Sequence, residues 1–170
     1  MGLGRKYIYI LVVLMGLLAS VSESKAQRIA VSTNAVGWLA LSPNVGLDLS
    51  VARHHTLAMS VSASPWKIGQ GLYLNHITVS PEYKYWFSMP YSGHYLGGGL
   101  MYSSYDIAAG SFAAKGNLVA ACVNYGYSMI IGTRWNLVPF VGLGAGVNVA
   151  EKAGFAPAAR LGLNIQVLLR

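Results

Sequence analysis

The stretch that decides the fold is Arg160-Leu161-Gly162-Leu163-Asn164-Ile165-Gln166-Val167, in which bulky apolar residues alternate with polar or small ones. A helix cannot place these two sets on opposite faces because its period is 3.6 residues, whereas successive side chains of a strand point in opposite directions. One face of this strand is aliphatic, and the other carries Arg160, Asn164 and Gln166. A strand with two such faces lies between an apolar phase and a wet interior, which is typical of a membrane β-barrel.

The composition of the chain favours the same interpretation. Of the 170 residues, 54% are hydrophobic and only 10% are charged, whereas about a quarter of the residues of an average soluble domain are charged. A transmembrane helix needs about 20 apolar residues. The longest internal candidate, 137–150, is interrupted by Pro139 and by glycines at 142, 144 and 146. A chain that is apolar overall but has no internal stretch long enough for a transmembrane helix is typical of a β-barrel.

The N-terminal segment has the features of a secretory signal peptide. Arg5 and Lys6 precede a short apolar core at 7–19, and Ser24 and Ala26 provide the small residues that a signal peptidase recognises. We therefore predict cleavage before Gln27, with a signal peptide over 1–26 and one barrel domain over 27–170. The expected location is the bacterial outer membrane. An uncleaved membrane anchor is the alternative.

The charges of the chain are scattered. The formal net charge of +7 comes without a run of Lys or Arg, so it does not indicate a nucleic-acid partner. It suits outer-membrane lipid and lipopolysaccharide, which are the partners we expect. Cys122 is the only cysteine, so no internal disulfide can form, and we interpret it as a small packing residue. No motif predicts a cofactor or a metal site.

Eight alternating segments separated by turn signals follow Gln27. We place them at about 28–36, 43–53, 56–64, 76–87, 94–106, 117–131, 135–149 and from 157 onward. The connections after the second, fourth and sixth segments are tight, and those at 65–75 and 107–116 are longer. Outer-membrane barrels combine short periplasmic turns with longer external loops. The sequence therefore predicts an all-β, eight-stranded, antiparallel up-and-down transmembrane barrel, whose interior side chains can fill.

Polar residues on the inward face form the candidate site. The alternation predicts that the lumen contains Asp48, Glu82, Lys84, Arg160, Asn164 and Gln166. An unpaired charge in a narrow interior is costly, so these charges should pair or meet water. Two interpretations stay open, namely salt bridges that fill the lumen and the gate of a narrow channel. Inward glycines of the fifth and seventh strands are expected to leave room for bulky neighbours such as Trp86 or Phe140.

Aromatic residues gather near the ends of the predicted strands, where their amphipathic rings suit the depth of lipid headgroups. The sequence predicts interface positions near the tight turns for Tyr83, Tyr85, Tyr91, Tyr95 and Trp135. Near the longer loops it predicts them for Trp66, Tyr102 and Tyr105.

A lipid-modifying enzyme is the alternative from another class. His76 lies at the outer end of the fourth strand near loop serines and Asp106, and such a set can run acyl transfer. The chain has no nucleophile elbow, and His54, His55 and His94 fall at the opposite end of the barrel. We therefore expect no enzymatic activity.

Two motifs carry a family resemblance. They are Ser42-Pro43-Asn44-Val45-Gly46-Leu47-Asp48 with Ser64-Pro65-Trp66, and Ser80-Pro81-Glu82-Tyr83-Lys84-Tyr85-Trp86-Phe87 with Gly93-His94-Tyr95-Leu96-Gly97. They resemble a Bacteroidota family of small secreted outer-membrane barrels of unknown function, whose genes often lie near fimbrial components. The resemblance covers most of the mature chain and implies, at most, a cell-envelope or surface-assembly role. It carries over no catalytic residue, and we expect a monomer.

Overall fold

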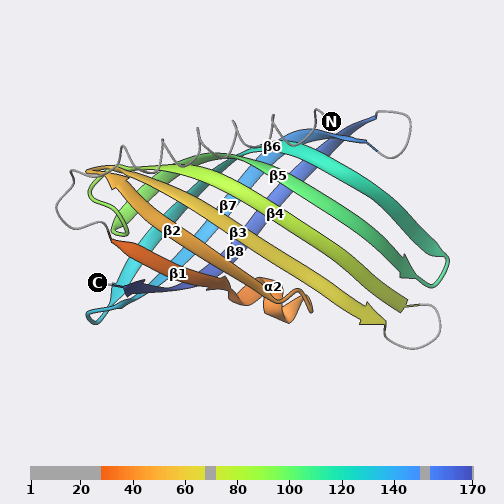
Figure 1. Ribbon diagram of the computed structural model, residues 1–170, viewed down its shortest axis with the longest axis horizontal. Helices are drawn as coiled ribbons and strands as arrows, with labels where there is room; N and C mark the ends of the chain where they lie inside the picture. Colours follow the sequence, from red (N-terminus) through yellow and green to blue (C-terminus); the bar gives the residue numbers. More distant parts are fainter. Residues whose placement is uncertain (1–27, 68–71, 150–153, 170) are drawn as a thin grey trace, which may run out of the picture.

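The computed structural model describes residues 28–67, 72–149 and 154–169, and these form one closed antiparallel barrel (Figure 1). The strands are β1 (Ile29–Asn34), β2 (Asn44–Ala52), β3 (His55–Lys67), β4 (Leu72–Trp86), β5 (Gly93–Ala109), β6 (Phe112–Ile131), β7 (Trp135–Asn148) and β8 (Phe155–Leu169), and a short helix, α2 (Ala35–Leu39), joins β1 to β2. Each strand pairs with its neighbour in sequence, and β1 pairs with β8 to close the barrel. The predicted eight-stranded up-and-down barrel is confirmed.

The alternation of the sequence explains the closure. In β8, Leu161 is 64% exposed on the outside, whereas Gln166 is 3% exposed inside. In β6, Val123 is 59% exposed, and its neighbours Cys122 and Asn124 are buried. A closed barrel lets every strand keep one apolar face outside and one small or polar face inside, without leaving a sheet edge along its wall.

The two ends of the barrel differ. The start of β1 and the end of β8 lie at the same end of the barrel as the connections after β2, β4 and β6. We call this the short-turn end. We call the opposite end, which holds α2 and the connections after β3, β5 and β7, the loop end. The predicted signal peptide falls outside the described residues. No helix in the described part of the chain is long and apolar enough to cross a membrane.

Both long loops predicted from the sequence are too long, because strands continue into them from both sides. β3 extends to Lys67 and β4 already begins at Leu72, while β5 and β6 are joined by a tight turn in which Gly110 has φ +60°. Conversely, the predicted first strand stops early. The Asn34 side chain accepts a hydrogen bond from the Val36 backbone N–H at 3.1 Å and so caps α2.

The wall of the barrel is uneven as a result. β1 has 6 residues, whereas β6 has 20, and the wall formed by β3 to β6 reaches well past α2 (Figure 1). On β5, outward side chains are apolar or aromatic from Leu96 to Tyr102 and then become polar at Ser104 and Asp106. A membrane-spanning strand needs about 9–11 residues. The outer surface therefore has an apolar belt, and an extension of β4, β5 and β6 continues beyond it.

Candidate functional site: the lumen

A cluster of large side chains fills the lumen at the short-turn end, and we call it the plug. Its members are Ala30, Trp86, Tyr91, Tyr95 and Val138, all exposed by 3% or less. The ring of Trp86 lies 4.8 Å from that of Tyr95 and 5.9 Å from that of Tyr91, measured between centroids. The plug therefore closes this end of the lumen with packed aromatic rings.

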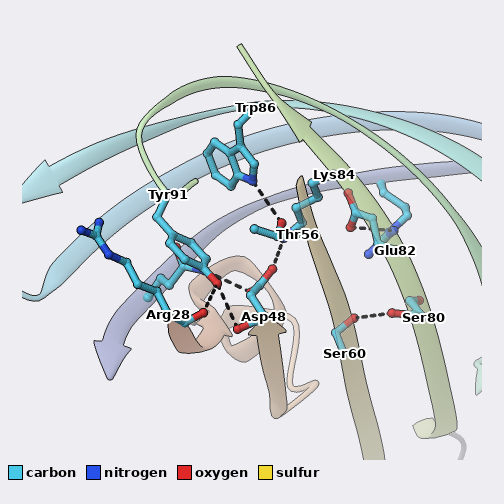
Figure 2. A network of polar contacts seen from close by, with 11 residues as sticks. Arg28, Asp48, Thr56, Ser60, Ser80, Glu82, Lys84, Trp86 and Tyr91 are labelled. Atoms are coloured by element: carbon cyan, nitrogen blue, oxygen red, sulfur yellow. Dashed lines mark hydrogen bonds and ion pairs between the residues drawn. The ribbon is translucent and has the colours of Figure 1, made fainter. Parts of the chain in front are cut away.

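Tyr91 is the central member of the plug, although it belongs to the turn between β4 and β5. The single proton of its hydroxyl is shared between the backbone carbonyls of Arg28 and Asp48, which lie 2.9 and 3.1 Å from the oxygen (Figure 2). Its own carbonyl accepts from Ser128 Oγ and Asn136 Nδ2, both at 2.8 Å. These bonds hold a backbone with φ +67°, which non-glycine residues rarely adopt. Burial raises the pKa of the Tyr91 phenol above its ordinary value, so the hydroxyl remains a donor.

Above the plug lie two ion pairs. Lys84 Nζ is 2.6 Å from Asp48 Oδ1, and the two side chains are only 7% and 2% exposed. Gln166 Nε2 donates to the second oxygen of Asp48 at 3.0 Å. Arg160 Nη1 lies 3.7 Å from Glu82 Oε2, which is a looser pair with side chains 15% and 9% exposed. Five of the six residues predicted for the lumen network therefore lie together on the inner face.

Glycines make room for these side chains, but the nearest neighbours of the inward glycines of β5 and β7 include Glu82 and Asn124 and not Trp86 or Phe140, which the sequence had suggested. A Cβ at Gly97 would collide with the Glu82 carboxylate, and a Cβ at Gly126 would collide with the ring of Tyr95. Phe140 fits against Gly162 of β8, whose added Cβ would come within 2.6 Å of the Phe140 ring. Each of these glycines, which has no side chain, thus lies beside a bulky side chain of a neighbouring strand.

A cavity of about 620 Å³ occupies the lumen from the ion pairs to the loop end. Lys84 and Arg160 line its inner part, and His76, Asn164 and the α2 residue Val36 line its outer part. The sixth predicted lumen residue, Asn164, therefore faces the same space as the ion pairs. The lumen is a cup with a charged floor above an aromatic base.

His76 lies at the mouth of the cup. Its Nε2 is 2.8 Å from Ser42 Oγ, so the structure brings together the histidine and a serine that the enzyme alternative needs. Asp106 does not complete a triad. Its carboxylate accepts from the Tyr73 hydroxyl at 2.7 Å and pairs with Lys115 at 3.2 Å, and it belongs to the outward set of β5.

The predicted interface aromatics divide into two groups. Tyr83, Tyr85, Tyr102 and Trp135 face outward and are 42–54% exposed. Tyr105 was expected with them, which is wrong. It belongs to the inward set of β5, three residues from Tyr102, and its hydroxyl accepts from Asn148 Nδ2 at 3.0 Å.

Trp66 also differs from these four in its contacts, although its side chain is 44% exposed. It belongs to the same alternating set as the buried Ser64, and both side chains donate to the backbone carbonyl of Leu41, at 2.7 Å and 2.9 Å. Trp66 therefore packs on the connection between α2 and β2 at the mouth of the barrel. Tyr91 and Tyr95, also expected at the lipid interface, are 1% exposed inside the plug.

The hydrogen bond that anchors Trp86 gives a testable prediction. Trp86 Nε1 donates to Thr56 Oγ1 at 3.0 Å, and Thr56 is fully buried. Thr56→Val keeps the shape but leaves the indole N–H without an acceptor, so we expect the free energy of unfolding to fall by about 1–3 kcal/mol. Urea titration of the refolded barrel measures this. Thr56→Ser is the control and should lose less, because it keeps the hydroxyl; equal losses would contradict this role of the bond.

The fold and the lumen define a closed eight-stranded barrel of the outer-membrane type, with an apolar belt outside and a polar, plugged interior. The chain belongs to the family described as "Protein of unknown function (DUF3575)", whose model matches residues 10–158. This agrees with the predicted resemblance to a family of unknown function. No curated protein matches the chain.

Two solved structures are similar in fold. The N-terminal β-barrel domain of Pseudomonas aeruginosa OprF superimposes with a TM-score of 0.61 at 12% identity, covering 86% of this chain and 100% of that one. Neisserial surface protein A (NspA) superimposes with a TM-score of 0.52 at 12% identity, covering 82% of this chain and 94% of that one. At this identity, the likeness concerns the fold alone.

Proposed function

We propose that this protein is a monomeric outer-membrane barrel with a structural role in the cell envelope. The observation that carries the proposal is the combination of a continuous apolar belt outside with a plugged lumen inside. The belt gives a reason for lipid to surround the barrel, since aliphatic side chains such as Leu143 and Leu161 are 72% and 64% exposed. The plug closes one end of the lumen, which supports a structural role over conduction or transport.

The extension of β4, β5 and β6 supports a finer proposal, a role in adhesion or in a surface assembly such as a fimbria. Its outward residues Asn75, Ser104, Asp106, Lys115 and Asn117 line a shallow pocket of about 400 Å³ beyond the belt. A polar sheet face held clear of the lipid is suited to contact another envelope protein. One similar fold belongs to a protein whose name describes it as a surface protein.

Fractionation tests the location. We expect the protein in outer-membrane fractions, with a band whose migration on a gel shifts when the sample is heated, because closed barrels resist detergent until they are boiled. Recovery as a soluble periplasmic protein would contradict the proposal. For the surface role, a pull-down from outer membranes should retain the same partner with the wild type and lose it when Asn75, Ser104 and Asn117 are replaced by Ala, while the heat shift persists.

The pair formed by Ser42 and His76 favours one second candidate, a lipid-modifying enzyme. Its expected signature is a change in the mass spectrum of lipid A that requires both residues. Comparison of strains with the gene, without it, and with His76→Phe decides the question. A spectrum that is the same in all three strains excludes this candidate.

A further inference from the structure

Two copies of one three-residue arrangement lie on the outer face at the short-turn end. We call them the His–Tyr triplets, and they are His55 with Tyr83 and Tyr85, and His94 with Tyr125 and Tyr127. In each, the histidine ring stacks on the first tyrosine, with interplanar angles of 26° and 24°. The second tyrosine is tilted against it by 56° and 54°. Two hairpins, β3–β4 and β5–β6, thus build the same constellation independently.

Each triplet also contains the same hydrogen bond. The Nδ1 atom of His55 forms a hydrogen bond with the Tyr83 hydroxyl. The Nδ1 atom of His94 forms one with the Tyr125 hydroxyl, at 2.6 Å. A tyrosine hydroxyl that donates to Nδ1 leaves the proton of a neutral imidazole on Nε2. With the bond in that direction, each triplet presents the Nε2–H of its histidine beside two tyrosine rings.

The triplets sit at the edge of the apolar belt. Along the outward faces of β3 and β5, the next side chains away from the turn are Leu57 and Leu96, which are 47% and 46% exposed. Tyrosine rings at such an edge mark the depth at which lipid headgroups lie. The donors of the triplets are therefore placed where phosphate oxygens of a lipid would be.

The charges of the short-turn end are basic. Arg28 precedes β1, Arg53 lies in the turn after β2 and Arg134 in the turn after β6, and all three are exposed. Among the residues that the structure describes, the acidic ones lie in the lumen (Asp48 and Glu82) or at the loop end (Asp106). Among the described residues, no carboxylate side chain on the outer surface of this rim competes with its attraction for anions.

We propose that the two His–Tyr triplets, with the arginine rim, are binding sites for the phosphate-bearing headgroups of anionic phospholipids in the adjoining leaflet. This inference rests on the proposed membrane location. The inference adds a class of ligand and two defined binding sites to that proposed location. Each site combines a hydrogen-bond donor with aromatic surface for the glycerol region, and the exposed arginines of the same barrel end supply the positive charge that an anionic headgroup requires.

Native mass spectrometry of the full mature barrel tests the two sites. The protein is extracted from vesicles that contain equal amounts of phosphatidylglycerol and phosphatidylcholine. We expect two tightly held phosphatidylglycerol molecules, retained over phosphatidylcholine by about fivefold or more. His55→Phe keeps the stacked ring but removes the N–H, so it should reduce two bound lipids to one. His55→Phe with His94→Phe should remove both.

Controls separate this inference from its alternatives. Lys115→Gln removes a positive charge at the loop end and should leave both lipids bound, with the heat shift of the wild type. Equal retention of the two lipids overturns the proposal, as does an equal loss in Lys115→Gln, which indicates a general charge effect. Displacement of the lipid by millimolar inorganic phosphate overturns the lipid assignment. A wild-type protein that fails to insert into neutral vesicles contradicts the proposed membrane location, and the lipid sites with it.

Discussion

Lys84→Met is expected to lower the free energy of unfolding of the barrel by about 3–5 kcal/mol, because it strands the carboxylate of Asp48 in the lumen without its cation. The carboxylate would keep the hydrogen bond from Gln166, but its 2.6 Å ion pair would be lost. A side chain that is 2% exposed has little access to water that could replace the lysine. Urea-induced unfolding in lipid vesicles, followed by tryptophan fluorescence, measures the loss.

A double variant distinguishes a stranded charge from lost packing. Asp48→Asn combined with Lys84→Met removes both charges and keeps an acceptor for Gln166, so most of the stability should return. Lys115→Met breaks the exposed pair with Asp106, in which the lysine side chain is 79% exposed, and should cost no more than about 1 kcal/mol. If the double variant were as unstable as Lys84→Met alone, the electrostatic explanation would be wrong.

Tyr91→Ala is expected to open the lumen at the short-turn end. The substitution removes a ring from the centre of the plug and two hydrogen bonds to the carbonyls of Arg28 and Asp48. We expect a loss of about 3–5 kcal/mol, as for other large buried aromatic residues. In planar bilayers the wild type should be silent, whereas Tyr91→Ala should show discrete single-channel steps.

Tyr91→Phe is the matched control, because it keeps the ring and removes only the hydroxyl. It should remain silent in bilayers and lose about 1 kcal/mol for its hydrogen bonds. Conductance of the wild-type protein would contradict the closed lumen and favour the narrow channel gated by Asp48, Glu82, Lys84 and Arg160. Silence of Tyr91→Ala would mean that the ion pairs above the plug are themselves sufficient to close the barrel.

The strands could be predicted from the sequence because lipid and lumen impose opposite demands on successive side chains. This contrast is strongest in β8, where Leu161 and Gln166 differ sharply in exposure. The ends of the strands were less predictable. Pro65 and Gly116 resemble turn signals, but both lie within strands that continue beyond the belt. Beyond the belt both faces of a strand can contact water, so either face accepts polar residues. The alternation of hydrophobicity therefore fades there although the strand continues.

The lumen was predicted in part, and the errors have a common origin. Tyr105 was assigned to the interface because it lies near the end of its strand, although it is an odd number of residues from Tyr102 and so points to the other face. The outward positions of Leu96 and Leu100 could have placed Tyr105 and Tyr95 inside, because each lies an odd number of residues from these leucines. No such signal existed for Tyr91. It belongs to a turn, where no periodicity exists, and its inward position depends on acceptors supplied by β1 and β2.

The early start of β6 has a consequence for crowded membranes. β6 begins at Phe112, but its first pair with β7 joins Leu118 to Asn148. Within the described ranges, residues 112–116 are therefore hydrogen-bonded to β5 alone, and an uncovered sheet edge invites an incoming strand. The ammonium group of Lys115 stands in this short edge. Charged side chains on an edge strand oppose pairing with a second edge, so Lys115 and its partner Asp106 disfavour contact between neighbouring copies at this part of the wall.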